Sequence, residues 1–196
     1  MKNYSIFIIA LIGLLMGCSS GSKKVFIIAS GNVEVVDNNV TLGSGTSHNE
    51  KEFLVSGDKF SVTTPSGTLD FNVPENGIYI LNLKPDTLVG SYQRTGTAVN
   101  QQVITQQDLS NKIDSLNLLV AGANVSAANR NYSIAPKQLA RISDNTNAQI
   151  IGPYKNVPGS FEAGKEHEIY KFYTNKEMHE VIERLSTMVE TKPAEE

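Results

Sequence analysis

Cys18 is the one cysteine of the 196-residue chain, and its thiol is the most reactive side chain that the sequence offers. A thiol can act as a nucleophile, bind a metal or accept a covalent modification. Lys2 and an apolar run from Ile6 to Met16 precede it, and this run is shorter than the roughly 20 apolar residues that a membrane-spanning helix needs. A positive start followed by a short apolar run is typical of a secretory signal. We therefore predict a signal peptide over residues 1–17.

The residues that close this segment, Leu15-Met16-Gly17-Cys18, resemble the signal of bacterial lipoproteins. Leu15 matches the aliphatic position of that family and Gly17 its small residue, whereas Met16 departs mildly from the pattern. The resemblance covers only residues 1–18. It implies that Cys18 carries a diacylglyceryl thioether and an acylated amine, with fatty acids such as palmitate. More than one acyl chain is what stable membrane anchoring requires.

The anchor leaves a short polar tether over residues 18–24, so we expect the folded part to stay close to the lipid surface. Ser19 follows Cys18, where an aspartate would indicate retention in the inner membrane. By this analogy, we expect a cell-envelope protein with the outer membrane favoured. Its partners would then be membrane lipid and a protein of the envelope.

The three histidines indicate no metal site. His167 lies between Glu166 and Glu168, but neighbouring side chains point to opposite faces of a strand, so the three side chains would not converge. His179 and Glu183 are four residues apart and could share a metal on a helix. A metalloprotease helix carries two histidines and a glutamate, however, and we favour a solvated helix face here. We expect no metal and no cofactor.

Nucleophilic catalysis is not indicated either. The nucleophile-elbow pattern GxSxG is missing from the sequence. The run Gly43-Ser44-Gly45-Thr46-Ser47-His48 lacks the lysine and the following helix of a phosphate loop. We interpret the polar segment Gly43–Lys51, which contains this run, as a long loop over one sheet edge or as a mobile flap. Asp58, Asp70 and Asp86 each lie beside a predicted turn, where aspartate is common. We therefore predict no catalytic residue and no enzymatic activity.

Six of the tyrosines form the other distinctive group and lie in or near predicted β segments. They could belong to the core, or those around 154–173 could form a recognition patch. We favour the core. The tyrosines in question are Tyr79, Tyr92, Tyr132, Tyr154, Tyr170 and Tyr173. The chain has no tryptophan, which argues weakly against a stacking platform for sugars. Its net charge is −3 with no dense basic run, so we expect no nucleic-acid partner.

Short strands with turns every 8–12 residues run from Val25 to about Arg94. They predict an N-terminal antiparallel β-sandwich or partly closed barrel over residues 25–100. We place strands at Val25–Ala29, Asn32–Val36, Val40–Leu42, Phe53–Val55, Lys59–Thr64, Thr68–Val73, Ile78–Leu83 and Thr87–Tyr92.

Residues 101–190 predict a helical and mixed region packed on this sandwich, followed by a disordered tail over 191–196. Leu109, Ile113, Leu116 and Val120 form one helical stripe, and Thr105 is a candidate cap for this helix. Pro136 could open a short helix over Lys137–Ile142.

Two strands and a second helix complete the predicted elements. The strands lie at Gln149–Ile151 and Ile169–Tyr173. Thr174 and Glu177 form a capping-box pattern before an apolar stripe from Met178 to Val189. The predicted fold class is therefore α+β.

Three functions from different classes remain open. The first is a non-enzymatic envelope lipoprotein that acts as a structural, accessory or interaction subunit of a complex. The second is a lipoprotein that binds a small ligand or a glycan, with Gly43–Lys51 as a flap. The third and least favoured is an envelope hydrolase.

Overall fold

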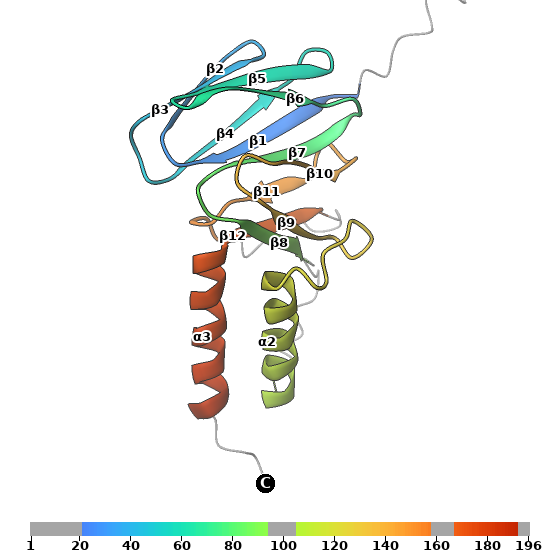
Figure 1. The fold of residues 1–196 in the computed structure, drawn as a ribbon. Helices are drawn as coiled ribbons and strands as arrows, with labels where there is room; N and C mark the ends of the chain where they lie inside the picture. The colour runs from blue at the N-terminus through green and yellow to red at the C-terminus, as the bar shows by residue number, and fades with distance from the viewer. Residues whose placement is uncertain (1–20, 94–104, 158–166, 192–196) are drawn as a thin grey trace, which may run out of the picture.

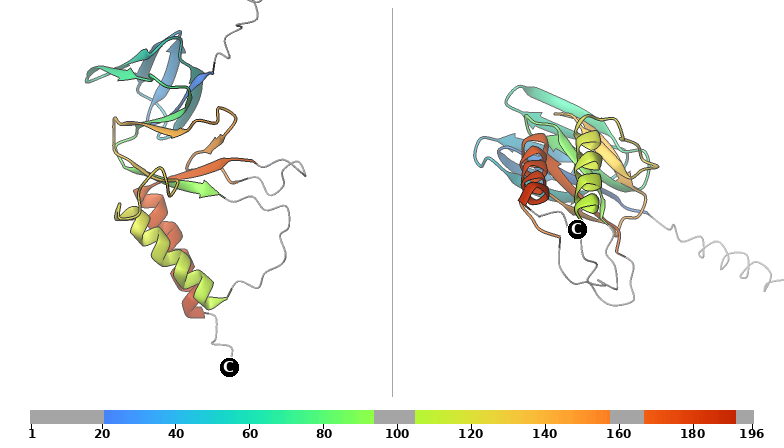
Figure 2. Two further views of the ribbon diagram at one scale, coloured as in Figure 1. Left: turned by 90° about the vertical axis from the view of Figure 1, so that its right-hand side faces the viewer. Right: turned by 90° about the horizontal axis from the view of Figure 1, so that it is seen from below.

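The computed structural model describes residues 21–93, 105–157 and 167–191, and these form four stacked layers (Figure 1). Three layers are four-stranded β-sheets and the fourth is a pair of helices. The side view in Figure 2 shows the order from one end to the other: outer sheet, middle sheet, helix-side sheet, helices. No helix in this part of the chain is long and apolar enough to cross a membrane.

The elements of each layer follow in their spatial order. The outer sheet contains β2 (Asn32–Val36), β3 (Asn39–Gly43), β5 (Lys59–Thr64) and β6 (Gly67–Asn72). The middle sheet contains β10 (Leu139–Ser143), β7 (Gly77–Leu83), β1 (Lys23–Ala29) and β4 (Asn49–Leu54). The helix-side sheet contains β11 (Gln149–Ile151), β12 (Ile169–Thr174), β8 (Leu88–Gln93) and β9 (Asn131–Ile134). The helix layer contains α2 (Gln106–Val120) and α3 (Asn175–Thr191).

The middle sheet explains why β1 and β7 are apolar along most of their length. Its two faces pack on different cores, and side chains alternate between the faces of a strand. Val25 and Ile27 of β1 therefore face the outer sheet, whereas Phe26 and Ile28 face the helix-side sheet. A strand buried on both sides needs a continuous apolar run instead of an alternating one.

The third core lies between the helix-side sheet and the two helices. Val89 of β8 and Met178 of α3 meet Leu116 and Leu119 of α2 there. The predicted caps of both helices are confirmed. The Thr105 hydroxyl accepts a hydrogen bond from the Asp108 amide, and the Thr174 hydroxyl accepts one from the Glu177 amide. Seen from below in Figure 2, the two helices lie side by side.

The coarse α+β prediction is confirmed, and two sheets pack face to face as a sandwich requires, but the prediction that the strands are antiparallel is wrong. All three sheets are mixed, because β1 pairs in parallel with β7, β3 with β5, and β11 with β12. None of the described sheets closes into a barrel. Turn residues predict the antiparallel direction of two strands joined by a hairpin. The parallel partners here are joined by long connections or lie far apart in the sequence, so no turn residue indicates their direction.

The predicted helix over Lys137–Ile142 is also wrong, because this stretch contains most of strand β10. Pro136 lies in a turn that is closed by a hydrogen bond from the Gln138 amide to the Ala135 carbonyl. Lys137 has a φ of 62°, which ends any helical path at that residue. The turn carries the chain from β9 in the helix-side sheet to β10 in the middle sheet.

Strands from the two predicted regions, 25–100 and 101–190, share two of the sheets. β10 completes the middle sheet beside β7, and β8 pairs with β9 and β12 in the helix-side sheet. The helix-side sheet therefore depends on β8 for its continuity.

Candidate functional site

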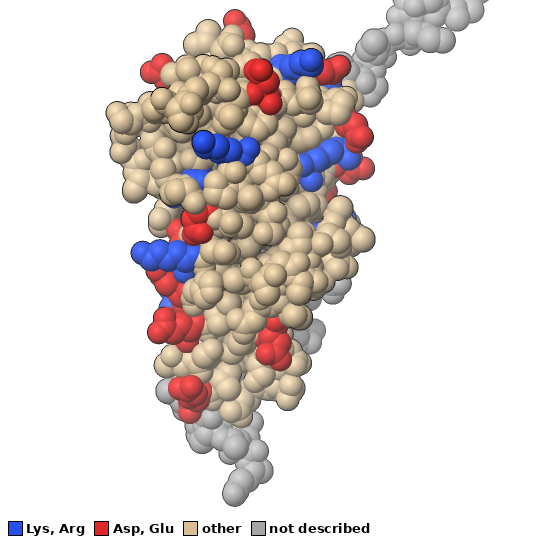
Figure 3. Space-filling model, in the orientation of Figure 1, with Lys and Arg blue, Asp and Glu red and all other residues tan. Residues whose placement is uncertain are grey.

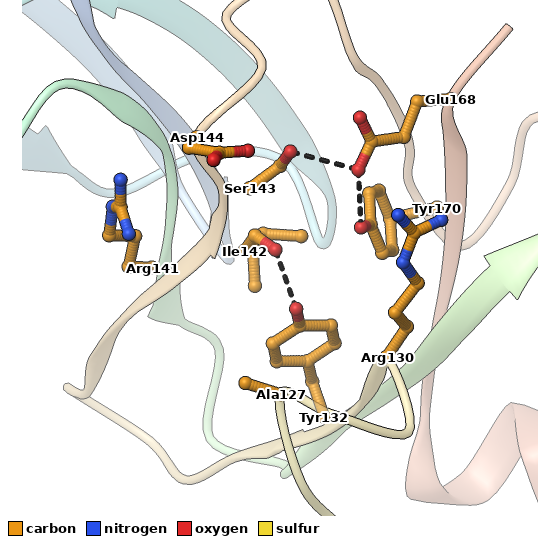
Figure 4. A pocket seen from close by; sticks show the side chains of 9 residues that line it. All are labelled: Ala127, Arg130, Tyr132, Arg141, Ile142, Ser143, Asp144, Glu168 and Tyr170. Carbon is orange, nitrogen blue, oxygen red and sulfur yellow. Dashed lines mark hydrogen bonds between the residues drawn. The ribbon is translucent and has the colours of Figure 1, made fainter.

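The candidate site is a hollow of about 350 Å³ between the middle and helix-side sheets (Figure 4). Three segments line it. Ala127 and Arg130 come from the loop before β9, residues 141–144 from the end of β10, and Glu168 and Tyr170 from the start of β12, with Tyr132 of β9 at its base.

Glu168 is the most constrained side chain of this hollow. Its Oε1 accepts hydrogen bonds from the Tyr170 hydroxyl at 2.6 Å and from the Ser143 hydroxyl at 2.8 Å. Its Oε2 accepts one from the Asn145 side-chain amide at 2.9 Å. Glu168 thereby joins the start of β12 to the end of β10, and so joins the helix-side sheet to the middle sheet.

The protonation of this cluster follows from burial and hydrogen bonding. Burial alone would raise the pKa of Glu168, but the hydrogen bonds from Tyr170, Asn145 and Ser143, with the charge of Arg130, outweigh it and lower the pKa. Burial, followed by the hydrogen bond to Glu168, raises the pKa of Tyr170. At neutral pH, Glu168 is therefore a carboxylate and Tyr170 a hydrogen-bond donor. This state suits the binding of a ligand rather than proton donation by Glu168.

The core interpretation of the tyrosines is confirmed for two residues of this hollow. Tyr170 is 1 % exposed and its ring packs edge-on against that of Tyr132, with 5.8 Å between the ring centroids. The Tyr132 hydroxyl donates a hydrogen bond to the Ile142 carbonyl. Tyr154 does not follow this interpretation, because its ring is exposed.

Arg130 borders the hollow without pairing with Glu168. Its guanidinium carbon lies 4.6 Å from the centroid of the Tyr92 ring, which is a cation–π distance. Among the described residues, no carboxylate forms an ion pair with it. The second arginine of the hollow, Arg141, contacts Glu75 and the Asn76 carbonyl instead.

A second hollow, of about 600 Å³, lies on the other side of Arg130. Residues of β8, α2 and the loop before β9 line it: Tyr92, Gln93, Lys112, Ala128, Asn129 and Arg130. Its two charged residues, Lys112 and Arg130, are both positive. The arrangement offers an anion two cations and an aromatic face.

A separate buried cluster lies around Lys171 of β12. The Lys171 ammonium group donates hydrogen bonds to the carbonyl oxygens of Gly152, Pro153 and Lys155. The Glu50 carboxylate lies beside the same turn and forms an ion pair with Lys155, with 2.6 Å between Oε2 and Nζ. These contacts hold the chain after β11 against the edge of the sheets.

The segment Gly43–Lys51 contains the end of β3, a loop and the start of β4. Three hydrogen bonds to carbonyls of this loop are present: the Gly31 amide donates to Thr46 at 2.7 Å, and the Lys84 ammonium and the Ser30 hydroxyl donate to Ser47 at 3.0 and 3.2 Å. These contacts favour the interpretation as a loop over that as a flap. His48 lies 2.9 Å from Glu50, measured from Nε2 to Oε1.

The remaining residues considered from the sequence are not brought together. His179 donates from Nδ1 to the Asn175 carbonyl in α3, and no metal-binding group of acidic, histidine and cysteine residues occurs in the part of the chain that the structure describes. Asp58 pairs with Lys23 and Asp70 accepts from Ser61, so each has a local partner. Cys18 and Glu166 lie outside the described residues.

Sequence reasoning missed the two residues that define the hollows. Glu168 was considered only as a neighbour of His167, since its partners Ser143 and Asn145 lie more than twenty positions away in the chain. Arg130 lies in an irregular loop without hydrophobic periodicity, and no local pattern marks it. A φ of 53° at Arg130 is a feature that only the structure reveals.

No family model matches the chain, and neither a curated protein nor a solved structure is significantly similar to it.

Proposed function

We propose that the chain is a non-enzymatic lipoprotein of the cell envelope, anchored through acylated Cys18, and that it acts as a structural or accessory subunit of an envelope complex. The support for the anchor is the segment Leu15-Met16-Gly17-Cys18 with its resemblance to the lipoprotein signal. Ser19 after the cysteine favours the outer membrane by the same analogy.

The observation that carries the subunit role is the position of the helices relative to the start of the fold. β1 begins at Lys23, shortly after Cys18, and lies in the middle sheet. The pair α2–α3 forms one end of the stack, opposite the outer sheet (Figure 1). A short tether would thus hold the outer and middle sheets near the lipid and leave the helix pair farther from it. The distance between the middle sheet and the far end of the helix pair follows from two lengths. Stacked sheets lie about 10 Å apart, and α3 is about 25 Å long.

The surface of the helix pair suits a protein partner. Leu118 of α2 is 48 % exposed and Met188 of α3 is also exposed, so the pair presents large apolar side chains to the solvent. Acidic side chains lie over the helix end of the molecule on the face drawn in Figure 3. Apolar anchors within a polar rim are typical of protein interfaces.

Capture of a small ligand or a glycan is the second candidate function. One observation favours it: the two hollows that meet at Arg130 bring together charged groups from elements that are distant in sequence. A concave site with a few convergent polar groups is the usual form of a ligand site.

A pull-down from gently solubilised envelopes tests the subunit role. The wild-type chain should retain stoichiometric partners, and Leu118→Glu on the helix pair should lose them. Leu54→Glu is the matched control, since Leu54 is 62 % exposed on β4 in the middle sheet, away from the helix pair, and should keep the partners. Equal recovery of partners by both variants, or no partner with the wild type, would contradict the proposal.

A further inference from the structure

We infer that the hollow lined by Tyr92, Gln93, Lys112, Asn129 and Arg130 binds an acidic saccharide, meaning a sugar that carries a carboxylate or a phosphate. This inference rests on the second candidate function, ligand capture, and gives it a ligand class. It does not depend on the role of the helix pair.

The backbone of Arg130 is held in an unusual conformation. Its φ of 53° lies in the left-handed region, which a side chain other than glycine seldom adopts. Two hydrogen bonds fix it there: the Arg130 amide donates to the Ala127 carbonyl, and the Arg130 carbonyl accepts from the Tyr92 amide, both at 3.1 Å. A residue in this conformation costs free energy and persists only where its surroundings hold it. Such residues concentrate at active sites and ligand-binding sites.

The guanidinium group of Arg130 is also held in place. It lies over the Tyr92 ring, and Tyr92 packs in turn on the buried ring of Tyr170, with 5.8 Å between these two centroids. A cation–π contact uses the flat face of the guanidinium and leaves its N–H donors at the edge available. Those donors match the paired oxygens of a carboxylate or a phosphate.

The charge of the hollow selects an anion. Lys112 and Arg130 come from α2 and from the loop before β9, and no acidic residue is among the described residues that line the hollow. No described carboxylate pairs with either cation. The whole chain has a net charge of −3, so the positive charge of this hollow is opposite in sign to that of the molecule as a whole. An anion would receive the attraction of two charges at a site of about 600 Å³, which admits a small ligand.

The two amides of the hollow point to hydroxyl groups on the ligand. The Gln93 side-chain amino group donates to the Ser91 carbonyl, and the Asn129 amino group donates to the Asn124 side-chain oxygen. No hydrogen bond to either amide oxygen occurs among the described residues, so both oxygens can accept one from a ligand. An acidic sugar carries one acid group and several hydroxyl groups. The two cations can pair with its acid group, and the amide oxygens can accept hydrogen bonds from its hydroxyl groups.

Isothermal titration calorimetry on the full chain in a non-ionic detergent, at constant ionic strength, tests this inference. The probes are glucuronate, glucose 6-phosphate, glucose and inorganic phosphate. We expect saturable binding of at least one acidic sugar, with glucose and inorganic phosphate each binding about tenfold more weakly or not at all. A preference between glucuronate and glucose 6-phosphate would assign the acid group.

Variants assign the binding to this hollow. Arg130→Gln should weaken binding about tenfold or more, and Lys112→Gln severalfold. Arg130→Gly should fold, because glycine adopts the left-handed conformation freely, and it should also lose binding. Lys59→Gln in the outer sheet is the matched control for charge and should bind as the wild type does.

Three outcomes would overturn the inference: no saturable binding of either acidic sugar, equal binding by wild type and Arg130→Gly, or inorganic phosphate binding as tightly as glucose 6-phosphate. Binding of glucose alone, unaffected by Arg130→Gly, would also overturn it while leaving ligand capture in place.

Discussion

The Tyr170 hydroxyl donates a hydrogen bond of 2.6 Å to Glu168 Oε1, although the two residues are only two positions apart in the chain. Side chains two apart lie on the same face of an extended segment, so both face the middle sheet. Glu168 binds Ser143 and Asn145 at the end of β10, while the Tyr170 ring packs in the core between the sheets. This pair therefore connects the polar hollow with the apolar layer beneath it.

Replacing Glu168 should make the free energy of unfolding less sensitive to a fall in pH. The folded pKa of Glu168 lies below its ordinary value of 4.5, so its carboxylate contributes stability above that pH and loses it as the pH falls through the folded pKa. Glu168→Gln should lower the free energy of unfolding by about 1 kcal/mol at pH 7. Urea unfolding at pH 3 to 7 should show this difference shrinking toward acid pH. Glu190→Gln on the exposed side of α3 serves as the control, and a difference that stays constant with pH would refute this account of Glu168.

Lys171 should be required for stability despite being a buried charge. It is 5 % exposed, and its ammonium group donates to three backbone carbonyls. Lys171→Met keeps the aliphatic stem but leaves these acceptors without a donor, and an unsatisfied buried acceptor costs about 1–3 kcal/mol. We expect a loss of about 3 kcal/mol in denaturant unfolding. Lys176→Met, at an exposed lysine of α3, should change stability by less than about 0.5 kcal/mol. A loss of similar size in both variants would argue against the structural role of Lys171.

Gly152 should tolerate no side chain while Glu50 is present. A Cβ at Gly152 would lie 1.9 Å from Glu50 Oε1, and this carboxylate is itself held by His48 and Lys155. We expect Gly152→Ala to cost about 1–3 kcal/mol through overpacking. The cost should be smaller in a Glu50→Ala background, which a double-mutant cycle measures. Gly43→Ala is the control, because its nearest neighbour would be 3.9 Å away. Additive effects of the two substitutions would show that Glu50 does not confine Gly152.

The N-terminal cap of α3 should be measurable. The Thr174 hydroxyl accepts from the Glu177 amide at 3.2 Å, and the Glu177 carboxylate accepts from the Thr174 amide at 2.9 Å. Thr174→Ala should lower the free energy of unfolding by about 1 kcal/mol. Glu183→Ala, at an exposed position of the same helix, should not destabilise the fold, because alanine has the higher helix propensity. A thermal melt unchanged by Thr174→Ala would indicate that this cap contributes nothing.

Local chemistry predicted the parts of this fold that depend on neighbours in sequence. Asn32–Val36 and Lys59–Thr64 occur as predicted, because apolar alternation and adjacent turn residues define each strand. Thr174 and Glu177 marked the start of α3 for the same reason, since a capping box is complete within four residues.

Features that depend on distant residues were not predictable in this way. The sequence indicates no strand at β9 and predicts a helix at β10, because both strands form through pairing with β8 and β7. The segment around Pro136 has no strong period of its own, so the tertiary context decides it. Arg130 and Glu168 were missed as a site for the same reason: their partners come from β8, β10 and α2.

Membrane fractionation combined with intact-mass measurement tests the central claim, the lipid anchor at Cys18, most directly. The full chain would be expressed in a bacterium that processes lipoproteins, beside Cys18→Ala. We predict that the wild type is found in the membrane fraction, begins at Cys18 and has the added mass of a diacylglyceryl group and an amide-linked acyl chain, whereas Cys18→Ala is found in the soluble fraction. An unmodified Cys18, or a Cys18→Ala variant that stays with the membrane, would contradict the account.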